Sequence, residues 1–292
     1  MIGDPAFERF AVTPLAGALG AEIRGIDLSR SLPSGVADDI RRAFLKYHMI
    51  CIRDQRLGMD DYRRFARLFG EFSGNPIHVA MPGYPEFVKV VKQPGDTGPT
   101  FGGNWHSDLP WFEAPPKATM LYAEAVPPYG GDTLYANRHL AYEALSDGMR
   151  RRIDDLVSVH SGRNTYQVNA ALNSIKVVDE GWEVSLVDVE HPLVPRHPET
   201  GRKYLFISST IVRFADMTVE ESRPIVEFLM RHAVRPEFTC RLGWAAGSLA
   251  VWDNRCLLHH AVGDYAQFQR IVYRTTIAGE RPTAEDARAA AA

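Results

Sequence analysis

The chain has 292 residues, of which 45% are hydrophobic and 24% charged, and its formal net charge is −3. This composition is that of a globular protein that can bury a sizeable core. It lacks the basic balance typical of nucleic-acid binders, and no stretch approaches the roughly 18 apolar residues of a membrane span. We therefore expect a cytoplasmic protein with neither nucleic-acid nor membrane partners.

The three cysteines are widely spaced and form no CxxC pair. This pattern argues against a disulfide framework and against a zinc ribbon. Each of Cys51, Cys240 and Cys256 is better interpreted as a small buried hydrophobic residue in a reducing compartment. The first nine residues contain acidic side chains and no apolar run, which is unlike a signal peptide.

The first third of the chain predicts a mixture of helix and strand. Apolar residues recur at helical spacing over residues 40–47 and again over 62–69, and the run Met49–Arg53 between them reads as a strand. Much later, Thr218 followed by Glu221 has the spacing of a capping box and predicts the start of another helix.

Strand-like runs dominate the rest of the chain, and turn signals rich in proline and glycine separate them. The predicted strands are Glu86–Lys92, Ala118–Val126, Lys203–Ser209, Ser248–Trp252 and Arg270–Ala278. Strands without alternating helices favour a two-sheet antiparallel roll over a Rossmann-type sheet. We expect a mainly β protein with peripheral helices, as one domain over residues 1–282 and a flexible tail over 283–292.

A candidate metal motif lies at His106 and Asp108. In an extended segment, residues i and i+2 point to the same face, roughly 6–7 Å apart at Cα, so both side chains can reach one cation. The pattern alone is weak, because the chain contains ten histidines. The similar run His197-Pro198-Glu199 has the composition of a surface turn, and we do not interpret it as a ligand pair.

The C-terminal segment strengthens this motif. The run Trp252–Arg255 closes an apolar strand and leads to His259 and His260, either of which could be a ligand on spacing alone. Two histidines and one carboxylate form the facial triad of non-haem Fe(II) oxygenases, which leaves positions on the metal open for a co-substrate and O₂. The remaining histidines are interpreted as satisfied core residues: His48, His78, His139, His160, His191 and His232.

Two arginines follow on one face of the last predicted strand. Arg270, eleven residues after His259, offers a planar fork for the distal carboxylate of 2-oxoglutarate. Arg274 should lie about 13 Å further along the same face. At that distance it is free to meet the anionic group of a substrate, since a buried arginine needs an anion.

Together these residues resemble the taurine dioxygenase and aryloxyalkanoate dioxygenase family of Fe(II)/2-oxoglutarate oxygenases. The resemblance runs through residues 19–28, 53–55, 104–108, 113–116, 130–134, 142–146 and 252–274. It implies a double-stranded β-helix, or jelly-roll, core. It also implies His259 as the second histidine, Thr133 as a 2-oxoglutarate ligand beside Arg270, and Fe(II), 2-oxoglutarate and O₂ as the reactants. We further expect a homo-oligomer, a dimer or a tetramer.

The substrate end departs from the taurine enzymes. Asn75 stands where the family has a sulfonate-binding histidine, His78 lies nearby, and Phe101 falls in a run that is polar in those enzymes. A site that lacks a matched donor discriminates against a taurine-like zwitterion. We therefore expect a more apolar organic anion, such as an aryloxyalkanoate, bound near Arg274. The alternatives are a taurine, alkylsulfonate or alkylsulfate substrate, a zinc hydrolase, or a non-catalytic jelly-roll binding protein.

Overall fold

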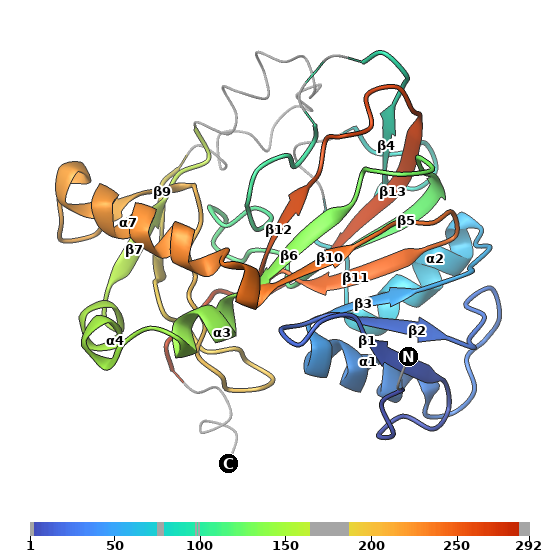
Figure 1. Cartoon of the computed structure of the whole chain (residues 1–292), viewed down its shortest axis with the longest axis horizontal. Helices are drawn as coiled ribbons and strands as arrows, with labels where there is room; N and C mark the ends of the chain where they lie inside the picture. Colours follow the sequence, from blue (N-terminus) through green and yellow to red (C-terminus); the bar gives the residue numbers. More distant parts are fainter. Residues whose placement is uncertain (1–2, 75–78, 97, 99, 164–186, 286–292) are drawn as a thin grey trace.

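The computed structural model describes residues 3–74, 79–96, 98, 100–163 and 187–285, and its strands dominate the core (Figure 1). The strands are β1 (Ala11–Pro14), β2 (Ala21–Arg24), β3 (Met49–Ile52), β4 (Val88–Lys92), β5 (Ala118–Ala125), β6 (Thr133–Asn137), β7 (Val157–His160), β8 (Val189–Pro192), β9 (Ile211–Phe214), β10 (Thr239–Leu242), β11 (Leu249–Asp253), β12 (Leu257–Ala261) and β13 (Arg270–Ile277). The helices are α1 (Val36–Tyr47), α2 (Met59–Ala66), α3 (Arg138–Glu143), α4 (Asp147–Ile153) and α7 (Val219–Ala233), with short 3₁₀ helices at Arg67–Phe69 and Pro236–Phe238.

Two sheets form the layers of the jelly roll. The larger has seven strands in the order β1-β2-β3-β11-β5-β13-β4, and the smaller has the order β10-β6-β12. Neighbouring strands in both sheets are antiparallel, apart from the parallel pair β2 and β3. The expected mainly β jelly-roll fold is confirmed. A third sheet, β8-β7-β9, lies to one side with α7 (Figure 1).

Strand β3 shows how the sequence specifies two cores at once. All four of its residues are buried, because alternate side chains point to opposite faces. Met49 and Cys51 join the cluster between the two sheets, which also contains Trp252 and Tyr135. Ile50 and Ile52 join the cluster under α1 and α2 on the outer face of the larger sheet. A strand covered on both sides reads as a continuous apolar run.

Most predicted elements are confirmed with small shifts of their ends. Helices α1 and α2 correspond to the two helical patterns in the first third, and Thr218 caps α7 with a complete capping box to Glu221. The predicted strands at β3, β4, β5, β11 and β13 are also present.

The strand predicted over Lys203–Ser209 is wrong. Its central residues, 204–208, are buried as a strand would require, but the backbone hydrogen bonds of the segment go to different partners. Leu205 donates to the carbonyl of Arg138 and Phe206 to that of Leu193. Only an isolated bridge between Lys203 and Arg196 resembles a ladder. An apolar run therefore predicted burial here but not sheet pairing.

The three cysteines are buried and free, as expected. Among the described residues, no helix has the length and apolar character that crossing a membrane requires. Thr283, the first residue of the predicted tail, accepts a backbone hydrogen bond from Arg196 at 2.8 Å. Residues 286–292 lie outside the described part.

Candidate metal centre

The side chains of His106, Asp108 and His259 converge between the two sheets. His259 lies on β12, and His106 lies in the loop that leads to β5. The backbones of the two histidines pair as an antiparallel bridge, with N–H to O distances of 3.0 and 2.7 Å. This bridge fixes the spacing of two residues that are far apart in sequence. The face shared by His106 and Asp108 thereby meets the inward face of β12.

The ligand atoms are close enough to bind one cation. The Oδ1 atom of Asp108 lies 3.9 Å from Nε2 of His106 and 3.8 Å from Nε2 of His259. Neighbouring ligands of an octahedral ion with bonds of about 2.1 Å are roughly 3 Å apart. Both distances from Asp108 are therefore within about 1 Å of a bound arrangement, and all three ligand atoms lie within 4.8 Å of one another.

The second carboxylate oxygen of Asp108 is already occupied. Thr119 on β5 donates its hydroxyl to Oδ2 at 2.5 Å, and Nη2 of Arg274 lies 2.8 Å from the same atom. The Asn254 side chain holds the backbone of Asp108, accepting from its N–H at 2.8 Å and donating to its carbonyl at 2.9 Å. These contacts orient Asp108 so that Oδ1 alone faces the histidines.

The ring of His106 is also oriented. Its Nδ1 lies 2.7 Å from the carbonyl oxygen of Asn104, so the proton belongs on Nδ1 and the lone pair on Nε2. His259 is 7% exposed, whereas His260, the next residue, points away from the site and packs against Trp105. The alternation along β12 thus selects His259 over His260.

Burial and neighbouring charges shift the pKa values of Asp108 and His259. Burial raises the pKa of Asp108, but Arg274, His259 and His106 lower it, and the net result lies well below the usual value. Burial, with His106 as a second cause, lowers the pKa of His259 well below its usual value. A carboxylate at Asp108 beside a neutral imidazole at His259 is the protonation state that a divalent cation requires.

Arg270 and Thr133 lie together at the end of the same pocket, and the structure adds Trp244 to them. The indole Nε1 of Trp244 donates to the Thr133 hydroxyl at 3.0 Å. The Arg270 guanidinium lies over the Trp244 ring at 5.6 Å and over Tyr265 at 6.0 Å. Within the described residues, the buried Nε of Arg270 has no hydrogen-bond partner. A buried guanidinium without a carboxylate is a site for an anion.

Arg274 shares the buried face of β13 with Arg270, as expected. It also forms a 2.8 Å ion pair with Asp108, which the strand pattern did not predict. Both arginines line the same pocket. The alternation along the strand predicted their shared face, but the approach of Asp108 depends on how the loop after His106 packs against β13.

Apolar side chains complete the pocket around these polar groups. The lining residues are Val90, Phe101, Gly102, His106, Asp108, Leu121, Thr133, Trp252, His259, Ala261, Arg270, Val272 and Arg274. Phe101 is therefore at the pocket, with 42% of its surface exposed. The predicted substrate residues Asn75 and His78 lie outside the described residues.

His197 is the main correction among the other histidines. Its run does form a turn, but the side chain is fully buried and its Nε2 lies 2.9 Å from Oδ2 of Asp253. The surface position expected for it is wrong. Its neighbouring Pro and Gly predicted the turn correctly, but they carried no information about the strand that packs over it.

Sequence reasoning missed three residues that hold the site. Thr119 and Trp244 were not predicted at all, and Asn254 was noted only as part of a motif. The position of Asn254 directly after the strand that leads to His259 was the one feature of the sequence that could have predicted its role at the site. Thr119 and Trp244 contact the site from segments with no distinctive local pattern.

A double-stranded β-helix with a buried two-histidine, one-carboxylate centre defines a class of non-haem metal oxygenases. Residues 11–276 match the family model described as taurine catabolism dioxygenase TauD, TfdA family. The chain therefore belongs to the TauD/TfdA family of dioxygenases. This membership favours an oxidoreductase over the zinc hydrolase and the binding protein that the ligand set alone left open.

Similar proteins cover nearly the whole chain. An α-ketoglutarate-dependent sulfate ester dioxygenase of Pseudomonas putida is 34% identical over 280 residues, covering 94% of this chain and 91% of its own. An (S)-phenoxypropionate/α-ketoglutarate dioxygenase of Sphingobium herbicidovorans is 32% identical, covering 98% and 99%. The crystal structure of a taurine dioxygenase from Burkholderia xenovorans has a TM-score of 0.79 at 35% identity, covering 94% of this chain and 91% of that one.

Proposed function

We propose that this protein is an Fe(II)- and 2-oxoglutarate-dependent dioxygenase that hydroxylates a small, largely apolar organic anion. His106, Asp108 and His259 are the proposed iron ligands. The observation that carries this assignment is that the two carboxylate oxygens of Asp108 have different contacts. Oδ2 is held by Thr119 and Arg274, whereas Oδ1 faces the Nε2 atoms of both histidines. Such orienting contacts are typical of metal-ligating carboxylates.

The proposed 2-oxoglutarate site extends from this centre toward Arg270. The guanidinium supplies a two-pronged donor for the distal carboxylate. The Thr133 hydroxyl accepts from Trp244, which leaves its own proton free to donate to the same carboxylate. Support comes from a structural relative, AAD-2 in complex with Mn(II) and N-oxalylglycine, at a TM-score of 0.77 and 30% identity over 94% of this chain. N-oxalylglycine has the shape and charges of 2-oxoglutarate.

When bound, Fe(II) supplies the oxidative decarboxylation of 2-oxoglutarate to succinate and CO₂, coupled to hydroxylation of the substrate. The residues of this chain position the reactants and exclude water. Arg270 and Thr133 fix the far end of the co-substrate, and the walls formed by Leu121, Trp252 and Val272 keep the pocket apolar. Orientation of this kind can lower a reaction barrier by several kcal/mol, because it holds the reactants at an effective concentration of the order of 10⁵ M or more.

Arg274 is the proposed partner of the substrate's anionic group. Its ion pair with Asp108 uses Nη2, and a guanidinium has five N–H donors, so one arginine can hold Asp108 and a substrate anion together. The apolar lining nearby, including Val90 and Phe101, favours a hydrocarbon or aryl body over a zwitterion. Aryloxyalkanoates have this combination of an apolar body and one anionic end.

Sulfate esters are the second candidate substrate class. The alkylsulfatase of Acinetobacter baylyi is 33% identical over 280 residues, covering 94% of this chain and 87% of its own, and the Pseudomonas enzyme carries a sulfate ester activity in its name. Both classes have a carbon attached to an oxygen substituent. Hydroxylation of that carbon gives a product that loses the substituent, so one reaction would cleave either substrate.

Succinate formation by the purified, Fe(II)-loaded protein tests the proposal. The panel contains phenoxypropionate, 2,4-dichlorophenoxyacetate, a medium-chain alkyl sulfate, an alkylsulfonate and taurine. We expect substrate-stimulated turnover with an aryloxyalkanoate or an alkyl sulfate and little with taurine. Turnover stimulated by taurine alone would contradict the substrate class. A lack of succinate with every compound, and also without any, would contradict the reaction.

A further inference from the structure

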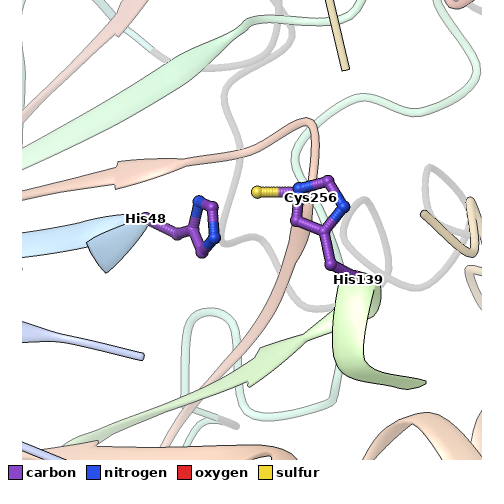
Figure 2. Close-up of side chains that lie close together, drawn as sticks. All are labelled: His48, His139 and Cys256. Carbon is purple, nitrogen blue, oxygen red and sulfur yellow. The ribbon is translucent and has the colours of Figure 1, made fainter. Parts of the chain in front are cut away.

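A second group of potential metal ligands lies outside the dioxygenase centre, at the turn between β11 and β12. His48 follows α1, His139 lies in α3, and Cys256 directly precedes β12. One ligand atom from each lies within 4.8 Å of the others, and all three residues are buried. Figure 2 shows the Cys256 sulfur pointing toward the His48 ring, with the His139 ring beside the cysteine. Three segments that are distant in sequence thus meet at one point.

The neighbouring set of His197, Asp253 and Cys256 has similar spacing, but its polar atoms are already in use. His197 contacts Asp253 through Nε2, and its Nδ1 accepts from the backbone of Glu199 at 3.3 Å. Both oxygens of Asp253 also bind the Arg255 guanidinium, at 2.8 and 2.7 Å. His197 and Asp253 are thus held by internal hydrogen bonds, which leaves Cys256 as the one member of this set that is open to a cation.

His139 is different, because one of its nitrogens is left without a partner. Its Nδ1 lies 2.8 Å from the carbonyl oxygen of Lys203, an acceptor, so the ring proton belongs on Nδ1. The Nε2 atom then carries a lone pair. It is buried in a fully buried residue, and it has no hydrogen-bond partner in the part of the chain that the structure describes. Buried lone pairs of this kind are rare unless something binds them.

The other two residues are suited to the same ligand. Burial lowers the pKa of His48 to about 4 and that of His139 to about 3, so both rings are neutral near pH 7. Among the described residues, the Cys256 sulfur has one hydrogen-bond contact, at 4.0 Å with the Asp253 carbonyl, and burial raises the pKa of its thiol. Neutral imidazole and cysteine sulfur are the ligands that zinc and similar soft cations prefer.

We propose that His48, His139 and Cys256 form a second metal site, for a soft divalent cation of the zinc type, distinct from the iron centre. In a tetrahedral zinc site, sulfur and nitrogen ligands are about 3.5 Å apart. Small side-chain rotations bring the three atoms from their present spacing to that value. A cation here joins the end of α1, α3 and the β11–β12 turn through three protein ligands.

The charged groups around this site are paired with one another or bound to backbone carbonyls. Arg255 pairs with Asp253, Glu199 and Glu280 at 2.7, 2.9 and 3.5 Å. Arg138 is fully buried and binds only backbone carbonyls, at 2.6 to 3.2 Å. Glu199 also pairs with Arg41 at 3.6 Å. The carboxylates around the site thus have partners of their own, and Cys256 gives up its proton when a cation binds.

Cobalt(II) is the probe, because it enters zinc-type sites and its bond to a thiolate gives a strong near-ultraviolet band. The proposed iron ligands contain no sulfur, so that band reports only on a cysteine ligand. We expect the metal-free protein to bind two Co²⁺ per chain, one of them with the thiolate band. Cys256→Ala should bind one Co²⁺ and show no band. The matched variants Cys51→Ala and Cys240→Ala, at the other buried free cysteines, should keep both.

A second variant covers the case in which Cys256→Ala does not fold. His139→Asn keeps an N–H donor for the Lys203 carbonyl and removes the free Nε2, so it should weaken Co²⁺ binding at this site at least tenfold. Co²⁺ is supplied both to the folded chain and during refolding, because the site is buried. The proposal is overturned if neither route gives a thiolate band, or if the band survives Cys256→Ala. Succinate formation at the iron centre is scored separately, so failure of one assignment does not hide failure of the other.

Discussion

Replacing Trp244 by phenylalanine removes one N–H group from the proposed 2-oxoglutarate site and keeps an aromatic ring under Arg270. The indole donates to the Thr133 hydroxyl at 3.0 Å, and Thr133 is only 3% exposed. Without this donor, the hydroxyl loses the contact that directs its own proton toward the co-substrate. We therefore expect Trp244→Phe to weaken 2-oxoglutarate binding and to leave the metal ligands in place.

The size of the effect follows from one hydrogen bond. A neutral hydrogen bond contributes about 0.5–1.5 kcal/mol net, and about 1.4 kcal/mol corresponds to a factor of ten. The KM for 2-oxoglutarate should thus rise roughly 2- to 12-fold in Trp244→Phe. Trp244→Ala also loses the ring beneath Arg270, which adds about 0.5–2 kcal/mol. Its KM should rise further, by about 5- to 300-fold in total.

Succinate formation at varied 2-oxoglutarate and saturating substrate measures both constants. Trp111→Phe is the matched control, because the Trp111 Nε1 is buried without a partner among the described residues, and its KM should be unchanged. An unchanged KM for 2-oxoglutarate in Trp244→Phe, together with a raised KM in Thr133→Val, would refute the claim that Trp244 orients Thr133.

Three further predictions concern the metal, the substrate and the fold. Thr119→Val removes the hydroxyl from Oδ2 of Asp108 and should weaken Fe(II) binding about 10- to 100-fold, measured by metal titration; unchanged affinity would contradict the orienting role. Arg274 also contacts Asp108, so Arg274→Ala is assayed at saturating Fe(II); it should raise the KM of the primary substrate at least tenfold and that of 2-oxoglutarate less than threefold, and equal rises in steady-state assays would oppose the division between the arginines. Hydrogen bonds from Lys46 and Tyr47 lower the pKa of Asp4 from 3.8 to about 2, so its stabilisation is present above pH 4 and is lost as pH falls toward 2. Asp4→Asn should lower Tm at pH 5 and converge with the wild type near pH 2, and a constant difference would argue against this linkage.

The parts of the fold that sequence predicted best are those in which local pattern and burial agree. The alternation in β13 put Arg270 and Arg274 on one face, and the apolar run of β3 gave a strand buried on both sides. In both, a period of two is a property of the strand itself. The run over Lys203–Ser209 has the same apolar character, but its neighbours prevent a ladder, and no local pattern reports on them.

The candidate site divides in the same way. Two of the proposed ligands, His106 and Asp108, follow from a spacing of two residues, but the contacts that orient them come from distant segments. The pairing of Arg274 with Asp108 and that of Trp244 with Thr133 are set by how loops pack on the sheets. A turn pattern predicted the chain reversal after His197, but the burial of its side chain depends on Asp253.

The visible charge-transfer band of Fe(II) chelated by 2-oxoglutarate tests the central claim most directly. Anaerobic addition of 2-oxoglutarate to the Fe(II)-loaded protein should produce this weak band, which zinc cannot give. His259→Ala should abolish it, whereas His260→Ala should retain it, since His260 points away from the site. Absence of the band in the wild type at saturating Fe(II) and 2-oxoglutarate, or its survival in His259→Ala, would contradict the proposed centre.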